Sequence, residues 1–274
     1  MKKVIVKPAL LVLSIVFAVL STHGQVQVLK ENRPSGAFTR IVNNCSADIL
    51  LQQGNNNEIV VEADASVIGE IKTTITGNTL TVDMHNVRPF KKIKRLKVWI
   101  TVSNLEEIEI NGSGDLTTQN PLRSQNLKLR INGSGDARIE MDGGNLDASI
   151  NGSGDVTLTG VRGTLILGIH GSGDFEGSKM QLENAILSCF GSGDIRLEGK
   201  TANLKIDSYA SGDINTLNMP AEKVTLDVKG SGDVKTWATQ VAKVKLMCSG
   251  DVIIQGNPKD RQISKMGSGS IRFF

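Results

Sequence analysis

The sequence is poor in the residue types on which most enzyme sites and disulfide frameworks depend. Its 274 residues include 3 His and 3 Cys, and aromatic residues make up 4% of the chain. Only His85 and His170 lie after position 24, which leaves few side chains for acid–base catalysis near neutral pH. An odd number of cysteines predicts neither a complete disulfide framework nor a metal cluster.

The N-terminal segment accounts for the excess of positive charge. Lys2, Lys3 and Lys7 precede an apolar run from Pro8 to Leu20, which indicates a signal peptide over residues 1–24, cleaved after Gly24 or, alternatively, Ser21. Removing these three lysines from the 31 Lys and Arg leaves 28, against 28 Asp and Glu. A nearly neutral chain gives no bulk electrostatic attraction to nucleic acid, and no membrane-spanning segment is expected after cleavage.

One phrase, Gly-Ser-Gly-Asp, returns at nearly constant spacing from position 112 onward. It ends in turn at Asp115, Asp136, Asp155, Asp174, Asp194, Asp213, Asp233 and Asp251, and a last variant ends at Ser270. The Ser and the second Gly occur in all nine copies, whereas Ala210 and Cys248 replace the first Gly twice. Such a regular period indicates a repeat architecture.

The residues around each phrase alternate between apolar and polar, as strands do. We call each Gly-Ser-Gly-Asp phrase a corner, because the chain is expected to turn there. Leu127, Leu129 and Ile131 precede one corner, and Val156 and Leu158 follow another. Each repeat therefore reads as strand, corner, strand and a looser connection, such as residues 160–164 or 217–223. Since no repeat has room for a helix, the sequence predicts an all-β fold, a parallel β-helix (β-solenoid) with coils of about 19–21 residues. In such coils Cys189 and Cys248 would lie about 14 Å apart, beyond disulfide reach, and Cys45 has no obvious partner.

The corner residues raise two questions about the turn. A Gly in every copy indicates either positive φ or close approach of two backbones, and the first position, which tolerates Ala and Cys, is expected to be less strained. Stacked aspartates about 4.8 Å apart repel by about 1 kcal/mol per pair in water, so their carboxylates are expected to accept backbone N–H bonds at the turn, with a row of calcium ions as the alternative. The residues assigned to structural turns are Gly114, Asp115, Gly135, Asp136, Gly154, Asp155, Gly173, Asp174, Gly193, Asp194, Gly212, Asp213, Gly232, Asp233, Gly250 and Asp251.

The repeated corners, introduced by the segment from Trp99 to Asp115, resemble a bacterial family described as putative auto-transporter adhesin, head GIN domain. The resemblance covers Phe38 to Phe274. It implies the right-handed β-helix of the pectin-lyase-like superfamily and a role in cell adhesion. The family has no assigned catalytic residues, so it implies none here. Together with the signal peptide, it implies export to the periplasm, cell surface or exterior of a Gram-negative bacterium.

Residues 25–274 are expected to form one head GIN domain, with residues 25–104 as an irregular opening part and cap and residues 105–274 as the repeats. A cap is expected because an uncovered first coil would present a sheet edge to other chains. The opening part has predicted strands at residues 47–52, 58–62, 79–84 and 96–102, turns at 53–54 and 77–78, and a short helix over 65–71.

Two features are candidates for ligand contact. A basic cluster contains Lys91, Lys92, Lys94 and Arg95, and reads either as a solvated loop or as a contact for an anionic polymer. The residue just before each corner is Asn in the first three copies and then changes to the other candidates, His170, Phe190 and Tyr209. The Asn residues suit a hydrogen-bonded ladder. The rings would form an exposed stripe for a sugar or a partner if they point outward, and would be filler if they point inward.

Three functions are compatible with this sequence. The first is a non-enzymatic, adhesin-like binding module for a surface glycan or protein, and the second is a structural scaffold of the periplasm. The third is a polysaccharide-acting β-helix enzyme, but its site would need an irregular cluster of carboxylates, whereas here one Asp occurs per coil. The sequence predicts no cofactor, no metal and no catalytic residue, and leaves the ligand and the oligomeric state open.

Overall fold

The computed structural model describes residues 27–85 and 93–274, which form 21 strands and one short 3-10 helix, η1. The predicted signal peptide at residues 1–24, Lys91 and Lys92 lie outside the described residues. The strands are β1 (Val28–Arg33), β2 (Arg40–Asn43), β3 (Asp48–Gln53), β4 (Glu58–Asp64), β5 (Ile71–Thr76), β6 (Thr79–Met84), β7 (Leu96–Val102), β8 (Glu107–Ile110), β9 (Leu116–Thr118), β10 (Asn126–Ile131), β11 (Ala137–Glu140), β12 (Asn145–Ile150), β13 (Val156–Thr159), β14 (Arg162–Ile169), β15 (Phe175–Cys189), β16 (Ile195–Ser208), β17 (Ile214–Val228), β18 (Val234–Leu246), β19 (Val252–Gln255), β20 (Asp260–Lys265) and β21 (Ile271–Phe273).

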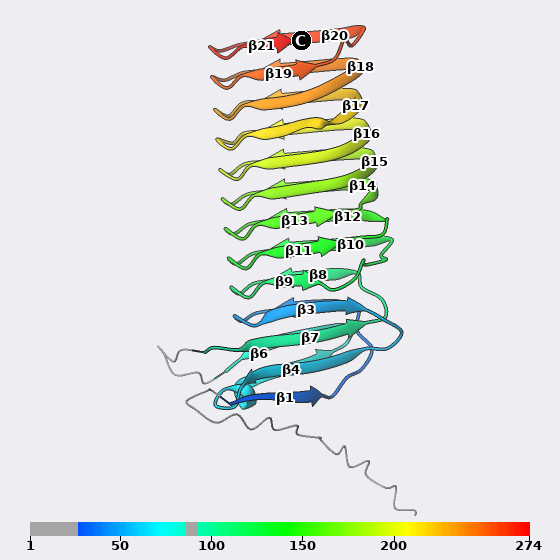
Figure 1. Ribbon diagram of the computed structural model, residues 1–274. Coiled ribbons are helices and arrows are strands. Elements are labelled where there is room, and N and C mark those ends of the chain that lie inside the picture. Colours follow the sequence, from blue (N-terminus) through cyan, green and yellow to red (C-terminus); the bar gives the residue numbers. More distant parts are fainter. Residues whose placement is uncertain (1–26, 86–92) are drawn as a thin grey trace, which may run out of the picture.

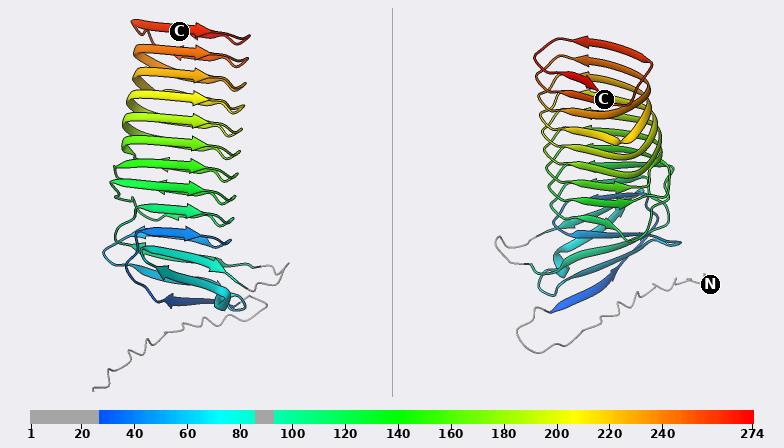
Figure 2. Two further views of the ribbon diagram at one scale, coloured as in Figure 1. Left: turned by 180° about the vertical axis from the view of Figure 1, so that it is seen from behind. Right: turned by 45° about the horizontal axis from the view of Figure 1, so that its top comes forward.

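The strands stack in parallel into a right-handed β-solenoid that rises from the N-terminal to the C-terminal end (Figures 1 and 2). The first face, ahead of the corners, contains β2, β8, β10, β12 and β14 in that order. The second face, after the corners, contains β3, β9, β11, β13 and the start of β15. The predicted all-β parallel solenoid, with one coil for each repeat of the sequence, is therefore confirmed.

The connections opposite the corners are more regular than the sequence predicts. From β15 to β18, one strand of 13 to 15 residues in each coil runs along the second face, around the bend and into the first face. The prediction of a loose connection at residues 217–223 is wrong in that these residues lie inside β17. Residues 217–220 have no partner on β18, however, and pairing resumes only at Ala221 and Lys223, across register shifts. Residues 160–164 are loose only at 160 and 161, where β13 ends and β14 begins.

The opening part doubles back before the repeats begin. The first coil is β2 and β3; the chain then descends through β4, η1 (Ile68–Glu70) and β5, and returns as β6 and β7 beneath that coil. Next, β8 and β9 pass over the first coil and pair with its upper side. Antiparallel pairings of β1 with β4, β4 with β7 and β5 with β6 close the N-terminal end (Figure 1). The four strands predicted here are present, but the helix expected over 65–71 is the single turn η1.

The interior is a set of apolar columns that run along the solenoid. One column contains Leu129, Ala148, Leu167, Leu187 and Ile206, all at most 1% exposed. Each member covers the one below it, so every coil is buried by its neighbours on both sides. The column ends at Ile263 of β20, which is 50% exposed because no coil lies above it.

Candidate functional site

Close packing between coils explains the repeated second glycine. A Cβ atom on Gly135 would lie 2.2 Å from the carbonyl oxygen of Gly114 in the coil below, and one on Gly173 would lie 2.1 Å from that of Gly154. Real Cβ atoms do not approach so closely, and φ is not in the left-handed region at either residue. Of the two explanations open from the sequence, close backbone approach is therefore the one observed.

The first corner position is not less strained than the second, contrary to expectation. A Cβ on Gly171 would lie only 1.8 Å from the carbonyl oxygen of Gly152. The carbonyl of Gly152 accepts from the N–H of Ser172, at the second corner position, whereas that of Ala210 accepts from Gly232, at the third. In the coil above Ala210, the residue that donates this hydrogen bond therefore lies one position further along the turn than in the coil above Gly152.

The aspartates form a hydrogen-bonded ladder that links successive coils. The N–H of Asp136 donates to Oδ1 of Asp115 over 3.0 Å, and that of Asp194 donates to Oδ1 of Asp174 over 2.7 Å. The pattern continues to the top, where the N–H of Ser270 donates to Asp251 over 2.8 Å and lowers the pKa of that carboxyl group. The carboxylates accept N–H bonds as expected, but from the next coil rather than from their own turn.

The ladder begins one corner earlier than the sequence suggests. Cys45-Ser46-Ala47-Asp48 connects β2 with β3, and Oδ1 of Asp48 accepts the N–H of Asp115 over 3.4 Å. Both glycines of the phrase are replaced there, and the aspartate of the next corner, Asp115, comes only after a long insertion, so the spacing does not reveal it. Its signals are the Asn before it and the Asp at its fourth position.

The carboxylates of the ladder are not clustered as metal ligands in the part of the chain that the structure describes. Within residues 27–85 and 93–274 no group of three or more His, Cys, Asp or Glu side chains could hold a metal ion. The second oxygen of two carboxylates instead faces an arginine, with Arg138 3.8 Å from Asp136 and Arg272 3.5 Å from Asp251. Hydrogen bonds from the backbone and ion pairs with these two arginines offset the repulsion between neighbouring aspartates.

The residues that precede the corners form one column on the outside of the solenoid, which we call the corner column. It begins as an Asn ladder, in which Asn111 donates to Asn44 over 2.8 Å and Asn132 donates to Asn111 over 2.7 Å. Asn151 continues this ladder by donating to Asn132 over 2.8 Å. The later members of the corner column are His170, Phe190, Tyr209, Lys229, Met247 and Met266.

The rings of the corner column point outward and stack on one another. The centroids of His170 and Phe190 are 5.1 Å apart, and those of Phe190 and Tyr209 are 5.2 Å apart, with planes within 10° of parallel. The ammonium of Lys229 lies 4.4 Å from the Tyr209 centroid and 2.6 Å from its hydroxyl. Because their faces lie against neighbouring rings, Phe190 and Tyr209, 49% and 46% exposed, present mainly their edges to solvent.

The described part of the basic cluster lies on the cap and is engaged within it. The backbone N–H groups of Lys94 and Arg95 donate to the Asp64 carboxylate over 2.9 and 3.1 Å, and the Arg95 guanidinium lies 3.4 Å from Glu62. Burial opposes ionisation of Glu62, but hydrogen bonds from Lys30 and Trp99 outweigh it and lower the pKa. Arg95 is thus ion-paired within the cap, while its side chain is 46% exposed.

The three cysteines do not pair with one another, as the sequence predicts. Cys45 and Cys189 are buried, and burial raises the pKa of both thiols. A raised pKa keeps these thiols protonated and unreactive near neutral pH.

Two overlapping stretches, residues 37–194 and 161–258, match the family described as "Putative auto-transporter adhesin, head GIN domain". The chain belongs to this family. No curated protein matches this member of the head GIN family. Across the described ranges, none of its helices has the length and apolar character needed to cross a membrane.

Solved structures share the architecture of this head GIN chain. A putative adhesin from Parabacteroides distasonis ATCC 8503 gives a TM-score of 0.72 at 18% identity, covering 92% of this chain and 98% of that one. A putative adhesin from Parabacteroides merdae ATCC 43184 gives 0.66 at 17% identity, over 90% and 96%. A putative lipid binding protein, also from P. distasonis ATCC 8503, gives 0.64 at 21% identity, over 90% and 96%. At such identities the likeness shows the fold alone.

Proposed function

We propose that this protein is a non-enzymatic, exported, adhesin-like module that binds a protein on a cell surface through the rings of its corner column. Membership of the head GIN family supports the adhesin-like role. Export rests on the predicted signal peptide at residues 1–24 together with the family description. The solenoid holds the corner column rigidly, because each coil is fixed to the next by backbone pairing and by the Asp ladder.

The single observation that carries this proposal is the outward stack of His170, Phe190 and Tyr209. Contiguous apolar surface on a soluble protein commonly marks an interaction site, because its burial by a partner is favourable. Stacked rings offer edges rather than open faces, whereas a sugar that binds to an aromatic ring packs on the open face of that ring. The geometry therefore favours a protein partner whose own apolar or aromatic side chains meet the ring edges.

A periplasmic scaffold is the second candidate, and a different observation favours it. Inter-coil bonds through Asp and Asn side chains run along most of the solenoid and would stiffen any body, whether or not it binds a partner. The two candidates differ in where the protein must lie. An adhesin must reach the outside of the cell, whereas a scaffold of the periplasm is enclosed by the outer membrane.

Protease treatment of intact cells, followed by mass spectrometry of the released peptides, tests this difference. Release of peptides from residues 25–274 without membrane rupture is the result expected of an adhesin. A lysed-cell control must show that the protein can be cut. Protection until lysis would refute direct adhesion and leave the scaffold as the better explanation.

Binding of the purified protein to intact partner cells then tests the column. We expect Phe190→Ala to weaken binding, while Ile166→Ala, which removes an exposed apolar side chain on β14 outside the column, leaves it unchanged. If Phe190→Ala bound to the cells as well as Ile166→Ala and wild type do, the contact would lie outside the corner column.

A further inference from the structure

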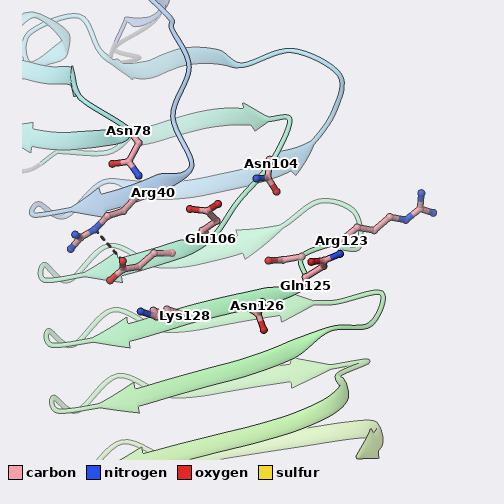
Figure 3. Close-up of a pocket in the computed structure, with 10 residues that line it drawn as sticks. Arg40, Asn78, Asn104, Glu106, Arg123, Gln125, Asn126 and Lys128 are labelled. Carbon is pink, nitrogen blue, oxygen red and sulfur yellow. Dashed lines mark ion pairs between the residues drawn. The ribbon is translucent and has the colours of Figure 1, made fainter.

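A polar hollow opens on the outer side of the first face, where the opening part meets the first repeats (Figure 3). Its walls come from β2, from the turn between β5 and β6, from the segment before β8 and from the segment that leads into β10. The volume of the hollow is about 620 Å³, which suits a small-molecule ligand. The hollow is separate from the rings of the corner column, which begin only after β14.

One group of side chains holds the wall of the hollow in place. The Arg40 guanidinium pairs with Glu109 and lies 3.6 Å from Glu107, which ties β2 to β8. The hydroxyl of Ser124 is buried and donates to the carbonyl of Leu105 over 2.8 Å, which ties the next coil to this one. These contacts fix the shape of the hollow without a ligand.

A second group of side chains is unengaged. The side chains of Asn104, Gln125 and Lys128 make no hydrogen bond or ion pair with any residue in the described ranges 27–85 and 93–274, and Figure 3 shows them around one opening. Each carboxamide offers two donors and an acceptor, and the ammonium offers three donors. Beside them, Glu106 uses one oxygen to accept the hydroxyl of Thr39 over 3.0 Å and leaves the other available.

The charges around the hollow balance. The lining carries three cations, Arg40, Arg123 and Lys128, and two carboxylates, Glu106 and Glu107. Arg40 pairs with Glu109 and Arg123 with Asp142, neither of which lines the hollow, so Lys128 and Glu106 are the lining charges left without an ion pair in the described ranges. One such charge of each sign gives the hollow no strong attraction for either an anion or a cation.

We propose that this hollow binds a neutral oligosaccharide of about two or three sugar units. Sugar hydroxyls both donate and accept, which matches a site of free carboxamides, one ammonium and one carboxylate oxygen. A lipid chain would find no apolar lining here, and an acidic sugar would find no excess of positive charge. This site is independent of the protein partner proposed for the corner column.

Titration calorimetry of the purified protein against maltotriose, cellotriose, mannotriose and xylotriose tests the proposal. We expect at least one trisaccharide to bind, and Lys128→Ala and Gln125→Ala each to weaken its binding about tenfold, since each removes hydrogen bonds to the ligand. Lys243→Ala is the matched control, because Lys243 occupies the same outward row on β18, several coils away from the hollow.

Three results would overturn the proposal. These are no binding of any of the four trisaccharides, equal loss of affinity in Lys243→Ala, and tighter binding of tri-galacturonate than of every neutral sugar. Tyr209→Ala separates the two sites, since it should leave trisaccharide binding intact while weakening attachment to cells. Sugar binding without attachment would refute the proposed column function alone, and attachment without sugar binding would refute this site alone.

Discussion

Replacing Asp194 by Asn or by Ala separates two roles of the Asp ladder, hydrogen-bond acceptor and carrier of charge. Oδ1 of Asp194 accepts the N–H of Asp213 over 2.7 Å, and its own N–H donates to Asp174 over 2.7 Å. Asn keeps an acceptor oxygen at the same place but removes the charge, whereas Ala removes both. The two variants therefore differ mainly in one inter-coil hydrogen bond.

The expected magnitudes follow from these contacts. Two neighbouring aspartates about 4.8 Å away repel Asp194 by about 1 kcal/mol each in water, and salt screens part of this. Asp194→Asn relieves that repulsion, so we expect the free energy of unfolding to stay the same or rise by up to about 1 kcal/mol. Asp194→Ala gains the same relief but keeps no acceptor, so it should lie below the Asn variant by the worth of one neutral hydrogen bond, about 0.5–1.5 kcal/mol.

Urea unfolding at low and at high NaCl measures both effects. The advantage of Asp194→Asn over wild type should shrink as NaCl rises, because it comes from relieved repulsion. If the Asn variant were as unstable as the Ala variant, the charge itself would be needed and the acceptor explanation would be wrong. A rise in the wild-type unfolding midpoint with added calcium, absent in the Asn variant, would point instead to bound ions.

Three further predictions concern the corner, the core and the cap. Gly173→Ala should destabilise the protein by several kcal/mol, since its Cβ would lie 2.1 Å from the Gly154 carbonyl oxygen. In the control Gly168→Ala, the Cβ would meet only His170, at 3.6 Å, so this variant should fold normally. Thermal unfolding midpoints of the two variants check this difference. Leu167→Ala should cost about 2–5 kcal/mol in urea unfolding, while Ile166→Ala, its exposed neighbour, should cost under about 0.5 kcal/mol. The pKa of Glu62 is lower in the folded protein than in the unfolded chain. The ionised carboxylate therefore stabilises the fold above its ordinary pKa near 4.5, and this stabilisation is lost as pH falls through the lower folded value. Glu62→Gln should flatten the pH dependence of the free energy of unfolding in that acidic range.

The period of the chain predicts the repeats well because one coil resembles the next. Alternating residues such as Leu165, Leu167 and Ile169 mark strands, and the Gly pattern marks corners, so fold and corner positions follow from local sequence. The prediction for the bend at residues 217–223 is wrong for the same local reason. Leu217, Asn218 and Pro220 break the alternation, yet the backbone stays within one strand, and its pairing with β18 resumes at Ala221.

The path of the opening part could not be predicted from local patterns. The first coil, β2 and β3, pairs above with β8 and β9, which follow only after the detour through β4, β5, β6 and β7. Where the chain returns depends on which edge of the first coil is free for pairing, and no residue of the corner at 45–48 indicates that an insertion follows. The outward direction of the rings, by contrast, follows the local alternation, because Ile169, Cys189 and Ser208 are buried and the residues directly after them, His170, Phe190 and Tyr209, are exposed.

The corner column separates stability from function within one row of positions, and this gives a last prediction. Its lower part is an Asn ladder with hydrogen bonds of 2.7–2.8 Å, and its middle part is the ring stack, with one ring per coil and centroids 5.1–5.2 Å apart. Replacing His170, Phe190 and Tyr209 together by Asn should extend the ladder from Asn151. The variant loses two ring contacts worth about 0.5–1.5 kcal/mol each, together with the contact between Lys229 and Tyr209, and gains up to three amide bonds of about 0.5–1.5 kcal/mol each. These terms largely offset, so the free energy of unfolding in urea should change by no more than about 3 kcal/mol. Binding to partner cells should nevertheless be lost, since the apolar edges are gone. A folded triple-Asn protein that still attached as well as wild type would show that the rings only stabilise the solenoid, and the proposed binding surface would have to be abandoned.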